Sequence, residues 1–245
     1  MPRYKLTIEY NGNGLVGWQR QTNGPSVQGN LENAVFCFSG EKITVFGAGR
    51  TDAGVHALGQ VCHLDLKETY PSRVIQNAIN AHLKPNAISV LKVQTTPPKF
   101  DARRDAISRT YEYRIVNRQA PLSLERGRAW WCPIPLNEAE MSRAAQQLIG
   151  EHDFTSFRSA RCQANSPIRT LDSLKIQRFG ENIYITGKAR SFLHKQMRAI
   201  VGTLKLVGDG RWTERDVALL LKAKDRRKGA ASAPPDGLYL TKVNY

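Results

Sequence analysis

The stretch RYKLTIEY, residues 3–10, decides the fold class, because its apolar and polar side chains alternate. One face carries the side chains of Tyr4, Leu6, Ile8 and Tyr10. The opposite face carries those of Lys5, Thr7 and Glu9. A period of two indicates a strand with one buried face. The sequence therefore predicts a sheet protein whose first strand is covered on one side.

The residues that follow this strand predict two helices and three further strands. Ser26 is a suitable cap for a helix whose apolar side chains recur at helical spacing up to Gly40. A second helix is expected after Pro71. The expected strands lie at 43–47, 60–66 and 88–93. The first half thus has the order βαββαβ.

A second unit is expected after the linker-like stretch Thr95-Thr96-Pro97-Pro98, where alternation returns in residues 110–117. Asn137 and Glu140 form a capping-box pattern for a helix that ends at Gly150. The other expected elements are strands at 170–178, 182–189 and 238–243, a helix at 192–207 and a short helix from Thr213. The order of this half is βαββααβ.

Two such units in succession predict an α+β protein made of two ferredoxin-like halves, an element order that RNA-recognition modules share. The halves are residues 1–105 and 106–245, with mainly antiparallel sheets. A central active-site cleft between the halves is the expected place for a ligand.

The charge balance favours a polyanionic partner. The 245 residues include 36 Lys and Arg against 21 Asp and Glu, which gives a net charge of +15. Residues 1–105 contribute +4 and residues 106–245 contribute +11, so the second half is expected to make more contacts with a phosphate backbone. A basic surface that serves only solubility is the alternative.

Neither a membrane segment nor a metal site is expected. No stretch approaches the roughly 20 apolar residues of a membrane helix, and the first ten residues lack a signal-peptide core. A cytoplasmic protein is therefore the expectation. The cysteines have neither zinc-type nor disulfide spacing, and they are interpreted as buried reduced thiols. They are Cys37, Cys62, Cys132 and Cys162.

Two glycine-rich stretches are candidates for function. The first, Gly12 to Gly17, matches the G-x-G-x-x-G pattern of dinucleotide-binding loops, but no helix is expected at its third glycine. A loop that brings Trp18, Gln19 and Arg20 to RNA fits this context better. The second stretch, VFGAGRTDAGVH, residues 45–56, runs from a strand end into a loop with Asp52. Taken alone, that loop is either an active loop or a turn in which Asp52 bonds its own backbone.

The second stretch extends to GRTDAGVHALGQV, residues 49–61, which resembles the signature of the tRNA pseudouridine synthase A family. Five further stretches, one before and four after this signature, match the family's order and spacing. The resemblance therefore covers essentially the whole chain. They are YNGNGLVGWQRQ (10–21), FDARRDAISRTYEYRI (100–115), DFTSFR (153–158), FLHKQMRAIVG (192–202) and AKDRRKGAASAPPDGLYL (223–240). Departures from the common pattern stand at Asn11, Leu15, Val16, Gln196 and Ala199.

The resemblance implies a cofactor-free homodimer that converts uridine to pseudouridine in the anticodon stem-loop of tRNA, at tRNA positions 38, 39 and 40. The target base must leave its stack, which costs a few kcal/mol. Asp52 is implied as the catalytic carboxylate, acting as a nucleophile or as the base that starts glycal formation. Arg198 is implied as its cationic partner, because a carboxylate in a dry cleft needs one.

Two further residues take roles from the resemblance. Tyr111 is implied to stack on the target uracil and to assist proton transfer, whereas Tyr113 on the same strand face reads as a core tyrosine. Arg50 is expected to fill the space of the flipped base or to hold its phosphate. Without the resemblance, Arg198 would be interpreted as a helix-surface residue. For Arg50, spacing alone leaves two alternatives open, namely this role at the nucleotide and a loop arginine paired with backbone.

Other functions fit the sequence less well. A non-catalytic RNA-binding protein would share the charge and the element order. A zinc-dependent deaminase would need H-x-E and P-C-x-x-C signatures, which this sequence lacks. A methyltransferase would need a cofactor loop that opens a helix, and neither glycine-rich stretch provides one.

Overall fold

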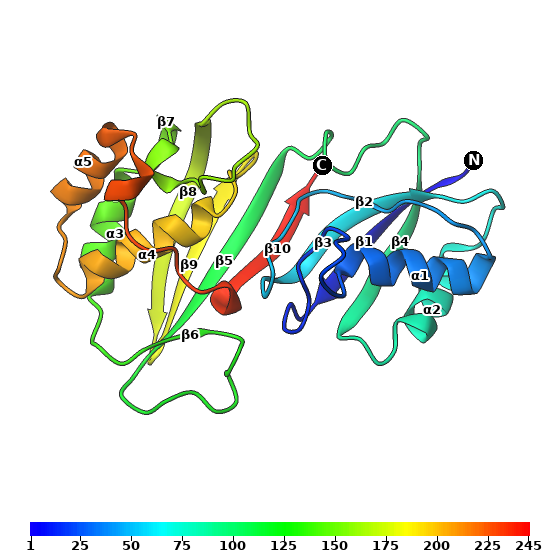
Figure 1. The fold of residues 1–245 in the computed structure, drawn as a ribbon, viewed down its shortest axis with the longest axis horizontal. Coiled ribbons are helices and arrows are strands. Elements are labelled where there is room, and N and C mark those ends of the chain that lie inside the picture. Colours follow the sequence, from blue (N-terminus) through cyan, green and yellow to red (C-terminus); the bar gives the residue numbers. More distant parts are fainter. The chain divides into compact units, whose positions relative to one another are not determined.

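The computed structural model describes all residues from 1 to 245, and Figure 1 shows it as a ribbon. The protein is a mixed α+β structure whose strands pair mostly antiparallel. Its chain forms two compact units. Unit 1 consists of Met1–Ile107 together with Tyr239–Tyr245, and unit 2 of Ser108–Leu238.

Unit 1 is built on the element order βαββαβ, which confirms the prediction. The elements are β1 (Arg3–Tyr10), α1 (Val27–Ser39), β2 (Phe46–Gly47), β3 (His56–Asp65), α2 (Ser72–Leu83) and β4 (Ile88–Thr96). In the sheet, β1 lies between β4 and β3 and pairs antiparallel with both. The short β2 pairs antiparallel with β3, and α1 lies beside α2 (Figure 1).

The core of unit 1 comes from the periodicities seen in the sequence. The alternate residues Tyr4, Leu6 and Ile8 of β1 are at most 1% exposed. The helices add the buried side chains of Val27, Leu31, Ala34, Val35, Ile75, Ile79 and Leu83. The Ser26 side chain accepts a hydrogen bond from the Gly29 backbone at 3.1 Å, and Gly40 ends α1 with φ of 72°. Both ends of α1 are therefore where the sequence places them.

The last strand corrects the expected boundary between the halves. Residues 106–245 were expected to form one half, whereas β10 (Leu238–Asn244) pairs parallel with β3, through Tyr239 with His56 and Leu240 with Ala57. Residues from Tyr239 onward belong to unit 1. The pattern of a strand predicts that it has a buried face, but it does not indicate which sheet the strand joins.

Unit 2 contains a four-stranded antiparallel sheet in the order β5-β9-β8-β7. Its elements are β5 (Ser108–Asn117), β6 (Trp130–Cys132), α3 (Glu138–Gln146), β7 (Gly150–Asp153), β8 (Ile168–Phe179), β9 (Asn182–Ala189), α4 (Gln196–Gly208) and α5 (Glu214–Ala223). The sequence did not predict β6 and β7. A strand of three or four residues is too short to establish a period, and β7 has the polar sequence GEHD.

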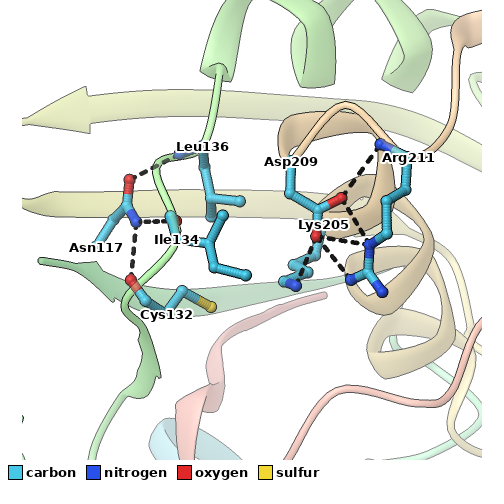
Figure 2. Close-up of polar contacts among 7 residues, drawn as sticks. All are labelled: Asn117, Cys132, Ile134, Leu136, Lys205, Asp209 and Arg211. Atoms are coloured by element: carbon cyan, nitrogen blue, oxygen red, sulfur yellow. Dashed lines mark hydrogen bonds and ion pairs between the residues drawn. The ribbon is translucent and has the colours of Figure 1, made fainter. Parts of the chain in front are cut away.

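Two polar clusters fix connections in unit 2 (Figure 2). The Asn117 amide donates to the carbonyls of Cys132 and Ile134 at 2.8 and 2.7 Å, which ties the chain after β6 to the end of β5. At the end of α4, the Asp209 carboxylate accepts hydrogen bonds from Lys205 and Arg211, both at 2.6 Å. No helix of the protein is long and apolar enough to span a membrane.

Candidate functional site

Asp52 lies in the loop between β2 and β3 of unit 1, and the backbone of this loop is held on both sides of it. The Thr51 and Tyr10 hydroxyls form a hydrogen bond at 2.8 Å. The backbone N–H of Trp18 donates to the Thr51 carbonyl at 3.1 Å. The Val55 N–H donates to the Asp52 carbonyl at 3.2 Å. Asp52 itself is only half-buried. A half-buried carboxylate on a fixed backbone suits a reactive group.

The glycine-rich loop of residues 12–17 packs against the Asp52 loop. A side chain at Gly12 would overlap the Val55 carbonyl, and a Cβ at Gly17 would stand 2.5 Å from the Thr51 carbonyl oxygen. Gly17 also has φ of +107°. These glycines therefore permit close approach between two backbone segments. No helix begins at Gly17, so the context of a dinucleotide site is absent.

Trp18 corrects one expectation for this loop. Its side chain is 4% exposed, and a Cβ at Gly47 would lie 2.5 Å from its ring atoms. A ring that is packed against Gly47 is not available to stack on RNA. Arg20 remains 68% exposed while it pairs with Glu32 at 2.8 Å, and Gln19 is exposed.

His56 is a supporting residue that the sequence analysis missed. Its ring is 2% exposed, and its Nδ1 accepts a hydrogen bond from the Gly12 N–H at 3.0 Å. The ring stacks on Tyr239 at a centroid distance of 4.6 Å. His56 thus links the Asp52 loop, the glycine-rich loop and β10. No local signal separates this role from that of an ordinary core histidine. Arg50, two residues before Asp52, is exposed.

Tyr111 and Arg198, the other predicted site residues, belong to unit 2. Tyr111 lies on β5 opposite Gly187 and is half-buried. Its ring is nearly perpendicular to that of Phe192, with the ring centroids 5.1 Å apart. Arg198 lies in the first turn of α4 and is half-buried. Its Nε donates to the Ala233 carbonyl at 2.7 Å. Arg198 is therefore anchored to a second chain segment and is not a simple helix-surface residue.

Tyr113 is fully buried, which confirms its interpretation as a core tyrosine. Its hydroxyl donates to the Pro234 carbonyl at 2.8 Å. Burial raises the pKa of Tyr113 well above its ordinary value, although the positive charge of Arg198 acts to lower it. The phenol therefore stays protonated and remains a hydrogen-bond donor at neutral pH.

The basic run of residues 222–228 is partly structural. Lys224 pairs with Asp153 at 3.5 Å. Arg227 pairs with Asp225 at 2.9 Å, and this hydrogen bond lowers the pKa of the Asp225 carboxyl to about 2. Arg226 is half-buried and donates to the Ala230 carbonyl at 2.7 Å. The exposed cations of the run that lack such contacts are Lys222 and Lys228.

The cysteines and the possible metal ligands add no further site. All four thiols are free. Burial raises the pKa of Cys62, and it raises that of Cys132 to about 11. Cys37 is exposed and Cys162 is half-buried, so the expectation of four buried thiols is wrong for these two. No group of three or more His, Cys, Asp or Glu side chains could hold a metal ion.

A basic α+β protein with a carboxylate on a buttressed loop and an anchored arginine on its second unit has the features of an enzyme that acts on a polyanion. The family model described as tRNA pseudouridine synthase matches residues 7–104 and 144–245, and the chain belongs to that family. The matched segments contain Asp52 and Arg198.

Relatives support the same assignment over the full length. A tRNA pseudouridine synthase A from Sinorhizobium fredii is 54% identical over 247 residues, and one from Rhizobium meliloti is 56% identical over the same length. One from Parvibaculum lavamentivorans is 53% identical over 245 residues. Each alignment covers 100% of both chains. A solved Cbf5-Nop10-Gar1 complex resembles the chain with a TM-score of only 0.37 and 9% identity, which is too little to carry an argument.

Proposed function

We propose that the protein isomerises uridine to pseudouridine in transfer RNA, in the anticodon stem-loop at tRNA positions 38, 39 and 40. The observation that carries the proposal is the family match in both units, together with full-length relatives more than half identical that are named tRNA pseudouridine synthase A. The anticodon stem-loop is the target that the resemblance in the sequence implies.

The reaction leaves the atomic composition of the nucleotide unchanged, although one hydrogen is exchanged. The bond from ribose C1′ to uracil N1 breaks, the base turns while it stays bound, and C1′ bonds to C5. The proton on C5 is lost to solvent or to a base, and N1 gains a proton. Because the product is an isomer of the substrate, the reaction needs no external oxidant, reductant or group donor, and we propose that the enzyme works without a cofactor.

Asp52 is the proposed catalytic carboxylate. As a nucleophile it attacks C1′ while the uracil leaves, and C5 of the turned base then displaces the carboxylate from C1′. As a base it removes the C2′ proton while the uracil leaves, and the resulting glycal regains a proton at C2′ when C1′ bonds to C5. Both routes require a carboxylate whose position is fixed beside the ribose. The contacts of Thr51, Val55 and Gly17 support this role, because they immobilise the backbone around the half-buried Asp52.

Tyr111, Arg198 and Arg50 complete the proposed set of residues that act on the same nucleotide. Tyr111 stacks on the uracil, and the T-shaped contact with Phe192 restricts the orientation of its ring. Arg198 is the proposed cationic partner of the carboxylate, and its Nε is held by the Ala233 carbonyl at 2.7 Å. Arg50 is exposed, as a residue must be if it fills the space of a flipped base or holds its phosphate.

The charge of each unit supports RNA binding. Unit 1 has 13 basic and 8 acidic side chains, and unit 2 has 23 and 13. Both units are therefore positive, and unit 2 carries twice the excess of unit 1. A phosphate backbone gains affinity from such a surface by releasing its counterions.

We also infer that the two units are ferredoxin-like halves of a cytoplasmic homodimer. The antiparallel neighbours β4, β1, β3 and β2 of unit 1 support the ferredoxin-like arrangement. The homodimer rests on the resemblance. Light scattering should give twice the chain mass of 27.5 kDa, and a mass of one chain would reject the dimer.

The test is tritium release from an unmodified tRNA transcript labelled at C5 of uridine, with purified protein in buffer that contains EDTA and no cofactor. Tritium should be released only from uridines that are converted, because only these lose the hydrogen on C5. Mapping of the product at base resolution should place pseudouridine on the 3′ side of the anticodon stem-loop. A lack of release would reject the activity, and release from uridines elsewhere would reject the proposed target.

A further inference from the structure

The chain segment of residues 230–237, between the basic run and β10, crosses the first turns of α4 beside Arg198. The Arg198 Nε donates to the Ala233 carbonyl at 2.7 Å, and the Ala233 N–H donates back to the Arg198 carbonyl at 2.9 Å. One turn further along α4, a side chain at Gly202 would overlap the Ala231 carbonyl. The 230–237 segment therefore lies directly on the helix face that carries Arg198 and Gly202.

The next residue of this segment is fixed from β5. The Tyr113 hydroxyl donates to the Pro234 carbonyl at 2.8 Å. A Cβ at Gly237 would stand 2.7 Å from the Tyr113 ring, so the chain also closes tightly around the phenol. Consecutive carbonyls, those of Ala233 and Pro234, thus accept hydrogen bonds from Arg198 and Tyr113. Because two prolines follow Ala233, the backbone between these anchors has little freedom.

The start of the segment has an anchor of its own. The Arg226 guanidinium donates to the Ala230 carbonyl at 2.7 Å and to the Ser232 hydroxyl at 3.3 Å. Contacts from three elements therefore hold this segment, whose residues 230–234 form no helix or strand and whose residues Pro235–Gly237 form a short 3-10 helix. An arginine side chain has several rotatable bonds, and a fixed acceptor at its Nε restricts the plane of the guanidinium. The 230–237 segment therefore sets the direction in which the terminal nitrogens of the Arg198 guanidinium point.

We propose that Tyr113 is a positioning residue for the pseudouridine reaction: by holding the 230–237 segment, it keeps the Ala233 carbonyl where it orients the Arg198 guanidinium. This inference rests on the proposed role of Arg198 beside the catalytic carboxylate. Tyr113 itself is fully buried and does not touch the nucleotide, so its effect passes through Arg198. A small misplacement of a catalytic group lowers the rate strongly, while substrate affinity depends on many other contacts.

The experiment is a double-mutant cycle with Tyr113→Phe and Arg198→Lys. Arg198→Lys keeps the positive charge but loses the Nε donor. Single-turnover rates and tRNA dissociation constants are measured for the wild type, both single variants and the double variant. Tyr184→Phe is the matched control, because Tyr184 lies on β9, the strand next to β5, and its ring contacts Phe179, which lies outside the 230–237 segment. Circular dichroism establishes a temperature at which every variant is folded.

Tyr113→Phe should lower the single-turnover rate by roughly 10- to 100-fold and change the tRNA dissociation constant by less than about twofold. In the Arg198→Lys background, the same change should lower the rate by less than about twofold, because the orientation it affects is already lost. A wild-type rate for Tyr113→Phe would overturn the proposal, as would equal losses in both backgrounds. A wild-type rate for Arg198→Lys would instead reject the proposed function of Arg198.

A spectroscopic measurement covers the case in which Tyr113→Phe weakens the fold. The Nε–H group of Arg198 is assigned in ¹⁵N spectra by its absence from Arg198→Lys. Its exchange with solvent should be slow in the wild type and in Tyr184→Phe, and at least tenfold faster in Tyr113→Phe. Equal exchange in the wild type and in Tyr113→Phe would overturn the proposed link between Tyr113 and Arg198.

Discussion

Asp209 shows how a single buried carboxylate closes a helix. Its side chain is 2% exposed and accepts hydrogen bonds from Lys205 and Arg211. Burial acts to raise the pKa of Asp209, but these hydrogen bonds outweigh burial and the pKa lies below its ordinary value. The carboxylate therefore stabilises the folded state above a pH of about 4, the pKa of an unfolded Asp, and this contribution is lost as the pH falls through the lowered pKa.

Asp209→Asn should lower the free energy of unfolding at pH 7 by about 2–4 kcal/mol, because it leaves the 14% exposed Lys205 ammonium without its counter-charge. Urea unfolding at several pH values measures this change. The difference from the wild type should shrink as the pH falls below about 4. Glu181→Gln, which breaks the exposed pair with Arg118, is the control and should cost at most about 1 kcal/mol. Equal losses in the two variants would contradict this account.

At this scale, the sequence indicates candidate reactive residues but not the residues that hold their surroundings. Asp52 stands out by its motif, and Tyr113 was correctly read as a core residue. Two hydrogen bonds near the candidate residues join positions far apart in the chain, namely His56 with Gly12 and Tyr113 with Pro234. These partners meet only after folding, and no local period or spacing indicates them.

At the scale of elements, the contact between the glycine-rich loop and the Asp52 loop is a feature of unit 1 that leaves no room for an added side chain at Gly17. Gly17→Ala would place a Cβ 2.5 Å from the Thr51 carbonyl oxygen at a positive φ. One of the two loops must then move, and Asp52 follows Thr51 directly. We expect the rate of pseudouridine formation to fall more than about tenfold, and single-turnover kinetics measures this loss.

Gly14→Ala is the matched control for Gly17→Ala. Gly14 also has a positive φ, +76°, but a Cβ there meets nothing within 4 Å. The control variant should therefore show the effect of backbone strain alone. Its free energy of unfolding should fall by about 1–2 kcal/mol, and the rate of pseudouridine formation should change at most a fewfold. If both variants lost the same activity, backbone strain and not the displaced Asp52 loop would be the cause.

Elements whose ends carry local signals were predictable. The cap at Asn137 and the capping box of Thr213 with Asp216 begin α3 and α5 through side chains next to the helix itself. The predicted helix at 192–207 begins later, at Gln196, because the Gln196 side chain accepts a hydrogen bond from the Leu193 N–H at 2.8 Å. This bond holds the preceding residues in a turn, and apolar spacing alone does not indicate it.

For the whole molecule, the sequence predicted a mixed α+β protein with two units, and the partner of the last strand was the main error. Tyr239 and Leu240 return to unit 1 and pair with β3, so the chain crosses from unit 2 back to the unit that holds Asp52. Tyr239 also stacks on His56, beside the Asp52 loop. The end of the chain is therefore a structural part of the unit with the proposed catalytic residue.

The central claim is that the Asp52 carboxylate carries out the isomerisation, and Asp52→Asn tests it most directly. Single-turnover pseudouridine formation and tRNA binding are measured side by side for the wild type, for Asp52→Asn and for Glu68→Gln. The last variant removes one negative charge from an exposed position of the same unit. Asp52→Asn should lose more than about 1,000-fold in rate and bind tRNA within about threefold of the wild type, whereas Glu68→Gln should match the wild type in both. An Asp52→Asn protein that forms pseudouridine within tenfold of the wild-type rate would contradict the account.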